Sequence, residues 1–473
     1  MENKKRGSFT GNLGFILATA GSAIGLGNLW RFPYLAAKDG GGLFILIYVI
    51  LVLTFGYTLM TAEISIGRKT GTGPLQAYGR IDRRFGFLGW ISTIVPLIIF
   101  PYYCVIGGWI VNYSAAYISG GAQNIYQTGP AEYFGSFISS EFSPLICFFV
   151  FMAICAVIVL LGIEKGIEKA SKIMMPILFV LIIFIAIYSL TLSHTAEDGT
   201  VRSALDGLKI YLIPDFSGMT VAKFISILLD AVGQMFYSLS VAMGIMITYG
   251  SYARKDSNLV TSINRIELFD TGVALLAGLI VIPSVFVFQG QEGLANSGPS
   301  LMFVSLPTVF EQMGIWGHIV GALFFVLVFF AAITSAISLM EAVTASIIDK
   351  FHLRRPVATA ICFVFSLVVG TIVCFGYNIL KCDIPLPNGT TGQILDLLDY
   401  VTNNLMLPIV AFLTCVLIGW VVKPKTVLDE IKIGQEKKTI AREKLFVVMI
   451  KFVSPILLVV LLLQAFNVFS FLG

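Results

Sequence analysis

The sequence predicts an all-α polytopic membrane protein. Of its 473 residues, 57% are hydrophobic and only 12% are charged, and the mean hydropathy is +0.89. Soluble domains carry about 25% charged residues, so most of this chain is suited to lipid rather than to water. Eleven apolar runs reach the roughly 20 residues that a helix needs to cross a bilayer. They span residues 9–36, 42–67, 87–119, 143–162, 170–192, 221–250, 261–289, 316–348, 357–377, 394–421 and 445–471.

The distribution of lysine and arginine predicts the orientation of these spans. With the N-terminus on the cytoplasmic side, 24 of the 31 basic residues fall in inner segments, seven of them in residues 422–444. This bias follows the positive-inside rule. Because the number of spans is odd, the C-terminus then lies outside. We therefore expect a multi-pass protein of the cell membrane with a cytoplasmic N-terminus and an extracytoplasmic C-terminus.

The composition also argues against other classes of function. A net charge of +4 gives no electrostatic footprint for nucleic acid. The seven cysteines lack paired metal-ligand spacing and the three histidines are scattered, so no metal cluster is expected. The sequence shows no grouped acid, base and nucleophile, which argues against an enzyme.

The stretch from Ala20 to Pro33 interrupts the first span. Three glycines and a serine occupy seven positions here, and each glycine weakens a helix by about 1 kcal/mol. In lipid, the carbonyls that a break releases must be buried in protein or must bind a ligand. Such oxygens and the Asn28 amide suit a cation, while the N-terminus of the following half-helix favours a carboxylate. A glycine-rich face that packs against a neighbouring helix explains the same residues equally well.

The sixth span carries a second stretch of small and polar residues, from Gly233 to Gly244. Two interrupted spans five helices apart indicate paired five-helix repeats with a binding site between them. The expected organisation is a cytoplasmic tail at residues 1–8, a first repeat at 9–193, an outer loop at 194–220, a second repeat at 221–421, a basic cytoplasmic loop at 422–444 and an eleventh span with an outer C-terminus at 445–473.

Three motifs resemble the neurotransmitter:sodium symporter family, whose members share the LeuT fold. They are Gly21–Asn28 with Arg31–Pro33, then Gln234–Gly244, then Phe330–Ser335. The first motif is the most specific, and the bacterial eleven-span branch is the most similar. The resemblance covers nearly the whole chain through the tenth span. It implies a 5+5 inverted repeat with an additional eleventh helix, first and sixth spans unwound at mid-membrane, and sodium-coupled symport by alternating access.

The resemblance implies two sodium sites built from oxygen ligands, which hard cations prefer. The first would use Ala23, Asn28, Ser238 and Asp270, completed by the carboxylate of the substrate. The second would use the carbonyls of Gly21, Ile24 and Ala331 with the hydroxyls of Thr334 and Ser335. The residues alone leave an alternative open, because a hydroxyl inside a membrane helix commonly bonds to the carbonyl four residues earlier.

Asp270 lies inside the seventh span, where a carboxylate indicates a functional site by default. The resemblance adds that chloride-dependent members of the family carry a neutral residue at the corresponding place. A fixed carboxylate here can replace chloride in the charge balance, so we expect transport without chloride. A structural pairing of Asp270 with a hydroxyl is the alternative.

The resemblance also implies the substrate-binding residues. They are Ser22, Ala23, Leu26, Gly27, Ile99, Tyr103, Tyr237, Ser238, Ser240, Met243, Ser335 and Leu339. The end that would hold the side chain is apolar and has no charged residue, so we expect a neutral, hydrophobic or aromatic α-amino acid. Ala242 stands where similar relatives have glycine, and Ser22 stands where the leucine-transporting relative has asparagine. The identity of the amino acid therefore stays open.

The resemblance implies a gate at each end of the substrate path. The outer gate would comprise Arg31, Asp399, Tyr103 and Tyr237. The inner gate would comprise Arg6, Phe9, Ser251, Tyr252 and Asp349. Exposed ion pairs contribute only about 0–1 kcal/mol, which suits contacts that open in every cycle. Glu63 is expected to accept hydrogen bonds from the broken backbone, and a proton relay is its alternative role.

These observations predict a sodium-coupled importer of a neutral, hydrophobic or aromatic α-amino acid that uses two sodium ions and no chloride. An ion channel and a proton-coupled porter, with Glu63 or Asp270 as the carrier, are the alternative classes. The lipid bilayer is the expected environment, nucleic acid is not an expected partner, and the sequence leaves a homodimer open.

Overall fold

The computed structural model describes residues 7–196, 199–296, 298–435 and 441–468. Within them, ten helices are long and apolar enough to cross a membrane, and one bent pair of helices makes an eleventh span. In chain order the spans are α1 (Asn12–Ala23) with η1 (Gly27–Arg31) and α2 (Phe32–Lys38); α3 (Gly42–Leu51) with η2 (Val52–Gly56) and α4 (Tyr57–Thr70); η3 (Arg83–Phe85) with α6 (Gly86–Ile118); α9 (Ser143–Leu160); η4 (Ile163–Glu168) with α10 (Lys169–Ser189); α12 (Val221–Ser238) followed by α13 (Ile245–Tyr252); α14 (Leu259–Gly293); α17 (Ile315–Phe351); α18 (Arg355–Phe375); α19 (Ile394–Asp399) with η6 (Tyr400–Met406), α20 (Leu407–Val416) and η7 (Leu417–Val421); and α22 (Glu443–Val448) with η8 (Met449–Val453) and α23 (Ser454–Ala465). The predicted all-α membrane fold is confirmed.

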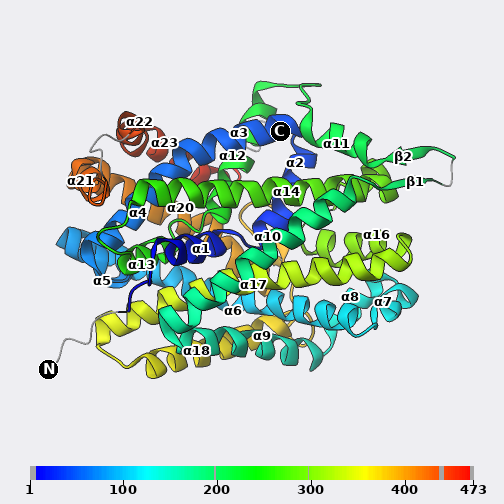
Figure 1. The fold of residues 1–473 in the computed structure, drawn as a ribbon, viewed down its shortest axis with the longest axis horizontal. Helices are drawn as coiled ribbons and strands as arrows, with labels where there is room; N and C mark the ends of the chain where they lie inside the picture. The colour runs from blue at the N-terminus through cyan, green and yellow to red at the C-terminus, as the bar shows by residue number, and fades with distance from the viewer. Residues whose placement is uncertain (1–6, 197–198, 297, 436–440, 469–473) are drawn as a thin grey trace.

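Short elements connect the spans at the two ends of the bundle. In Figure 1 the spans run along the long axis, with α5 and α21 at one end and α7, α8, β1 and β2 at the other. The connecting elements are α5 (Pro74–Ile81), α7 (Ala122–Thr128), α8 (Pro130–Ser139), β1 (Ser193–Thr195), β2 (Val201–Ser203), α11 (Ala204–Leu212), α15 (Gly298–Ser300), η5 (Leu301–Ser305), α16 (Leu306–Gln312), β3 (Ile384–Pro385), β4 (Thr391–Gly392) and α21 (Lys425–Ile431). β1 pairs with β2 and β3 with β4, both antiparallel.

The fifth span begins earlier than the sequence predicts, at Ile163 rather than near residue 170. The charges in this segment indicate a loop, but the wide turn of η4 buries one of them. Glu168 is 1% exposed, accepts a hydrogen bond from the Thr10 N–H at 2.8 Å and lies 2.7 Å from Lys172 Nζ. A buried carboxylate is tolerated when it is paired in this way, and hydropathy alone does not reveal the partners.

The first span is interrupted within its glycine-rich stretch. α1 ends at Ala23, η1 begins at Gly27, and the two halves bend by 54°. Gly25 has no room for a side chain, because an added Cβ would lie 2.7 Å from Ser335 Oγ. The stretch is therefore both a broken helix and a close packing face against α17, which are the two interpretations that the sequence leaves open.

The sixth span is interrupted between α12 and α13. Three residues there, Ser240, Ala242 and Gly244, have φ of 52°, 63° and 70°. This left-handed conformation costs a non-glycine residue roughly 1–2 kcal/mol. The Ala242 N–H donates to Glu63 Oε1 at 2.8 Å. Glu63 thus supports the irregular backbone, as the sequence predicts.

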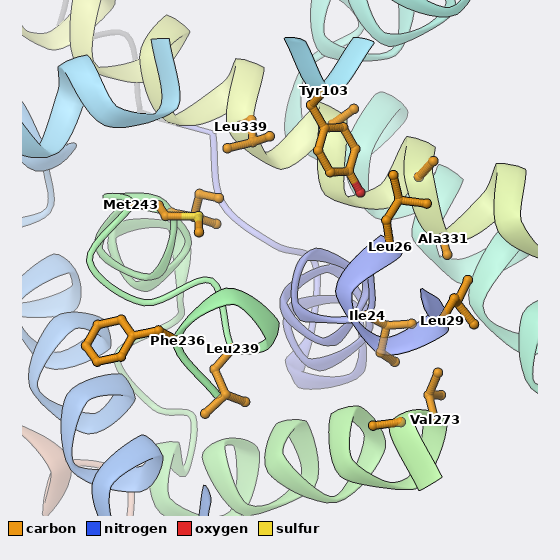
Figure 2. Close-up of a cluster of buried hydrophobic side chains, with 14 of the residues drawn as sticks. Ile24, Leu26, Leu29, Tyr103, Phe236, Leu239, Met243, Val273, Ala331 and Leu339 are labelled. Carbon is orange, nitrogen blue, oxygen red and sulfur yellow. The ribbon is translucent and has the colours of Figure 1, made fainter. Parts of the chain in front are cut away.

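Hydrophobic side chains surround the first-span break. Figure 2 shows Ile24, Leu26 and Leu29 at the break, with side chains from four further spans around them. Those are Tyr103, Phe236, Leu239, Met243, Val273, Ala331 and Leu339. All of these side chains are at most 5% exposed. The peptide groups of the break therefore lie where water cannot satisfy them.

A buried ion pair attaches α21 to the end of α4. The Arg68 side chain has no exposed surface; its Nε donates to Glu430 Oε1 at 2.9 Å and its Nη1 donates to the Ser257 carbonyl at 2.9 Å. Lys255 Nζ lies 3.3 Å from the same carboxylate oxygen. Removing one partner of such a buried pair costs roughly 3–5 kcal/mol. Although α21 follows the tenth span in the chain, this ion pair joins it to the second span and to the segment before α14.

Candidate substrate and cation site

A small cavity lies between the two interrupted spans. Its lining consists of Ser22, Ala23, Gly25, Leu26, Gly27, Asn28, Ile99, Tyr103, Tyr237, Ser240, Met243, Ile245, Ser335 and Leu339. All the predicted substrate residues except Ser238 are in this lining. The volume is about 30 Å³, whereas a cavity that holds benzene measures roughly 150 Å³. Lining side chains must therefore move before an amino acid can enter.

Sequence reasoning assigned no role to two of the lining residues, Gly25 and Ile245, and it assigned a third, Asn28, to the first sodium site. Gly25 lies inside the first-span motif, and its missing side chain leaves the space next to Ser335. Ile245 is the first residue of α13, directly after the break. Its position directly after Gly244, the last residue of the sixth-span motif, was the signal available in the sequence.

Three of the four residues predicted for the first sodium site, Asn28, Ser238 and Asp270, form one hydrogen-bonded cluster. Asp270 is fully buried, and its Oδ1 accepts from Asn28 Nδ2 at 2.8 Å and from Ser238 Oγ at 2.8 Å. Its Oδ2 accepts from Tyr48 Oη at 3.3 Å, a residue that sequence reasoning missed. The cluster joins the first, second, sixth and seventh spans.

The charge of Asp270 is not balanced by a basic side chain. In the part of the chain that the structure describes, no Lys or Arg nitrogen lies within 4.0 Å of it, and its three donors are neutral. A buried carboxylate without a counter-charge is costly. An alkali cation among these oxygens would supply that charge. The Asn28 amide nitrogen, not its oxygen, faces the carboxylate, so direct ligation requires the amide to turn.

The second predicted sodium site joins α17 to the first span through Ser335. Three backbone carbonyl oxygens lie within hydrogen-bond distance of Ser335 Oγ: those of Ser22 at 3.1 Å, Ile24 at 3.3 Å and Gly21 at 3.5 Å. These residues lie at the end of α1, where the regular helix stops. The oxygens suit a hard cation, which prefers such ligands.

The neighbouring Thr334 behaves differently from Ser335. Its Oγ1 donates to the carbonyls of Phe330 at 3.0 Å and Ala331 at 3.1 Å within its own helix. The back-bonding alternative therefore describes Thr334 in this structure. An added Cβ on Gly21 would lie 3.2 Å from Thr334 Cβ, so the threonine still packs directly against the first span.

Two tyrosines cover the cavity. Tyr103 Oη is buried and has no hydrogen-bond partner among the described residues, which is the state expected of a donor that meets a ligand. Tyr237 packs against Gly27, where an added Cβ would lie 2.3 Å from the ring. The Arg31 guanidinium lies 5.8 Å from the centre of the Tyr237 ring.

The predicted outer ion pair does not form in this structure. Arg31 and Asp399 make no contact within 4.0 Å among the residues that the structure describes. Asp399 Oδ1 accepts instead from Tyr102 Oη at 3.1 Å and Asn403 Nδ2 at 2.6 Å. Arg31 lines an outer cavity of about 260 Å³ that Tyr237 also borders. Both donors bind Oδ1 of Asp399, whereas Arg31 borders the outer cavity.

At the inner end, Phe9 connects the start of the first span to α13. Its N–H donates to the Tyr252 carbonyl at 3.2 Å, and its ring packs edge-on against Tyr249 at 5.8 Å. Tyr252 Oη donates to Glu341 Oε1 at 2.6 Å, and Arg355 Nη1 lies 2.6 Å from Glu341 Oε2. Sequence reasoning missed Glu341 and Arg355, because neither belongs to the motifs.

The remaining inner-gate residues are placed only in part. Asp349 Oδ2 accepts a hydrogen bond from the Gly73 N–H at 2.7 Å. The Ser251 hydroxyl donates to the Thr248 carbonyl of its own helix. Arg6 lies outside the described residues, so its predicted pairing with Asp349 stays a prediction.

A charged cluster joins the outer halves of the first and sixth spans. Lys38 Nζ lies 2.8 Å from Asp230 Oδ2 and 3.9 Å from Asp39 Oδ1. Asp39 is 4% exposed, and its Oδ2 has no hydrogen-bond partner in the described part of the chain. Burial, with a smaller effect from Asp230, raises the pKa of Asp39 from 3.8 to about 7. The charge of this outer contact therefore depends on pH.

Comparisons with known proteins agree with this geometry. A model described as the sodium:neurotransmitter symporter family matches residues 6–121 and 141–472. The chain is 34% identical to the uncharacterized sodium-dependent transporter YhdH of Bacillus subtilis, over 100% of both chains. It is 32% identical to an uncharacterized sodium-dependent transporter of Methanocaldococcus jannaschii, over 99% of this chain and 92% of that one.

A solved structure supports the same assignment. The crystal structure of MhsT in complex with L-phenylalanine matches with 33% identity and a TM-score of 0.85, covering 98% of this chain and 100% of that one. The LeuT fold that the motifs predict is thereby confirmed. This chain belongs to the sodium:neurotransmitter symporter family and is a sodium-dependent membrane transporter.

Proposed function

We propose that this protein is a sodium-coupled symporter that imports a neutral, hydrophobic or aromatic α-amino acid by alternating access, without chloride. The observation that carries the proposal is the buried Asp270, without a basic partner in the described residues, beside a cavity whose lining has no charged side chain. The solved structure of the relative MhsT in complex with L-phenylalanine supports an amino acid with an apolar side chain.

The lining divides into a polar part and an apolar part. The unpartnered Tyr103 hydroxyl and the nearby Asp270 cluster would receive the carboxylate, which would meet both a donor and a sodium ion. Ile99, Met243 and Leu339 would contact the side chain. A charged side chain would lose its hydration there without gaining a partner, so it would be rejected.

Coupling follows from a shared ligand. If the carboxylate of the amino acid completes the first sodium shell, each of the two raises the affinity of the protein for the other by the same factor. A second sodium ion would lie at the Ser335 junction and hold the first span against α17. Movement of one repeat against the other would then expose the site to each side in turn.

A thermal-shift screen of the purified protein against the twenty amino acids tests the proposal. A ligand that binds only the folded state stabilises it by about 2.7 kcal/mol at 100 times its Kd. We expect apolar amino acids to raise the melting temperature in sodium gluconate and in sodium chloride alike, and to have no effect in choline chloride. Equal shifts in choline chloride, or shifts that need chloride, would refute sodium coupling or chloride independence respectively.

Uptake into proteoliposomes separates this function from proton coupling. Glu63 Oε2 is buried without a hydrogen-bond partner among the described residues, which keeps a proton-coupled porter as the second candidate. An imposed sodium gradient at equal pH should drive uptake of the amino acid found in the screen. Uptake driven by a pH gradient in the absence of sodium would favour the second candidate.

A further inference from the structure

We infer that a groove beside α5 binds the phosphate of an anionic phospholipid. The groove has a volume of about 510 Å³ and lies where α5, the start of α6 and the end of α17 meet. Its lining consists of Leu75, Gln76, Gly79, Arg80, Arg83, Gly86, Phe87, Trp90 and Lys350. None of these residues belongs to the substrate cavity or to the two cation clusters.

Three basic residues and no carboxylate line this groove. Arg83 and Lys350 are exposed, and neither has an ion-pair partner within 4.0 Å among the described residues. Arg80 donates to the Thr70 carbonyl at 3.1 Å and to Gln76 Oε1 at 3.2 Å. Because both acceptors are neutral, they do not balance the charge of Arg80. Arg84 is different, since it pairs with Asp82 at 2.9 Å and does not line the groove.

The groove contains a place for a compact anion. Gly79 and Gly86 lie close together without side chains, and a Cβ added to Gly79 would lie 3.4 Å from Gly86 Cα. The missing side chains let α5 and the start of α6 approach each other closely, and the groove beside them is lined by cations from α5, η3 and α17. Arginine and lysine form their strongest hydrogen bonds to charged oxygens such as those of phosphate.

Two aromatic side chains indicate a lipid rather than a free phosphate. Phe87 is 50% exposed and Trp90 is 48% exposed, both on the first turns of the membrane-crossing helix α6. Aromatic residues with this exposure are typical of the boundary between headgroups and acyl chains. The groove lies at the end of the bundle that the basic residues assign to the cytoplasm, where anionic lipids attract Lys and Arg. The choice of this membrane face rests on the orientation that the distribution of lysine and arginine predicts.

The groove borders contacts between α5 and the end of α17. Gln76, which lines it, donates through Nε2 to the Asp349 carbonyl at 2.7 Å. Lys350, the next residue, supplies one of the three cations. A phosphate that contacts Arg80, Arg83 and Lys350 together would strengthen this junction, so lipid binding should raise the stability of the folded protein.

Lipid titrations of the purified full-length protein in detergent micelles test the inference. The probes are dioleoyl phosphatidylglycerol, dioleoyl phosphatidylcholine and inorganic phosphate, and the readouts are bound lipid by native mass spectrometry and the melting temperature. We expect phosphatidylglycerol to bind and stabilise while the other two do not. Arg83→Gln and Lys350→Gln should each weaken binding by roughly fivefold, and the double variant by roughly 25-fold. Arg354→Gln, which removes an exposed cation that does not line the groove, should leave binding unchanged.

The outcomes separate the alternatives. Unchanged phosphatidylglycerol binding in the double variant, or an equal loss in Arg354→Gln, would overturn the site. Stabilisation by inorganic phosphate equal to that by phosphatidylglycerol would overturn the choice of a lipid. The same variants should retain the sodium-dependent shift with the amino acid; if the wild type lacks that shift, the proposed function fails while the lipid result stands on its own.

Discussion

Substitution of Gly27 by alanine tests whether the tyrosine cover of the cavity controls binding. The added Cβ would lie 2.3 Å from Tyr237 Cδ1 and 2.7 Å from Cε1, where ordinary contact begins at 3.4 Å. The ring must therefore retreat by about 1.1 Å. Overpacking of this kind costs roughly 1–3 kcal/mol. If the cost falls on the covered, ligand-bound state, affinity should decrease about 5- to 150-fold.

The assay is the sodium-dependent thermal shift with the amino acid identified in the screen, titrated to saturation. The matched control is Gly272→Ala, on α14 and two residues from Asp270, where an added Cβ meets nothing within 4 Å. This control should bind normally and gain up to about 1 kcal/mol of helix stability. Wild-type affinity in Gly27→Ala would refute the reasoning, because the ring could then cover the cavity without touching Gly27.

Three further predictions concern charges and oxygens. Asp270→Asn removes the buried charge that a cation would balance. The apparent sodium affinity, measured from the sodium dependence of the thermal shift, should therefore decrease at least tenfold. Wild-type sodium affinity in a folded variant would exclude Asp270 as a ligand. Ser335→Ala removes the hydroxyl that lies against three carbonyls of the first span, and should lower sodium affinity. Ser338→Ala serves as the control, because that hydroxyl bonds to the Thr334 carbonyl and to Tyr249 Oη instead of to the first span. For Asp39, the folded-state pKa near 7 exceeds the unfolded value of 3.8, so the unfolded chain releases the proton first and stability decreases as the pH rises from about 4 to about 7. Asp39→Asn should remove this decrease in stability. The difference in melting temperature between the variant and the wild type should therefore grow between about pH 4 and about pH 7. A difference that stays constant with pH would contradict the raised pKa of Asp39.

Much of the fold can be predicted from the sequence because a bilayer imposes simple rules. A helix needs a minimum apolar length, and its interruption needs small residues, so the spans and both breaks were found. The start of the fifth span was missed because Glu168 looks polar in the sequence, while its partners Thr10 and Lys172 become visible only in the structure.

In the candidate site, too, some features can be predicted from the sequence and others become visible only in the structure. Motif residues such as Asn28 and Ser335 line the cavity, and their position in the interrupted first span and in α17 could be read from the sequence. Tyr48 was missed because its contact with Asp270 depends on how two helices distant in sequence approach each other. The separation of Arg31 from Asp399 was missed for a related reason: it depends on how two side chains from distant spans extend, and spacing in the sequence does not show this.

The Arg68–Glu430 attachment has a practical consequence for following the transport cycle. Because that ion pair ties α21 to the second span and to the segment before α14, a fluorophore or spin probe on α21 would report displacement of those elements rather than of the tenth span that precedes it. Two probes, one on α21 and one on the exposed start of α18, would then measure how far separate parts of the inner face travel during turnover.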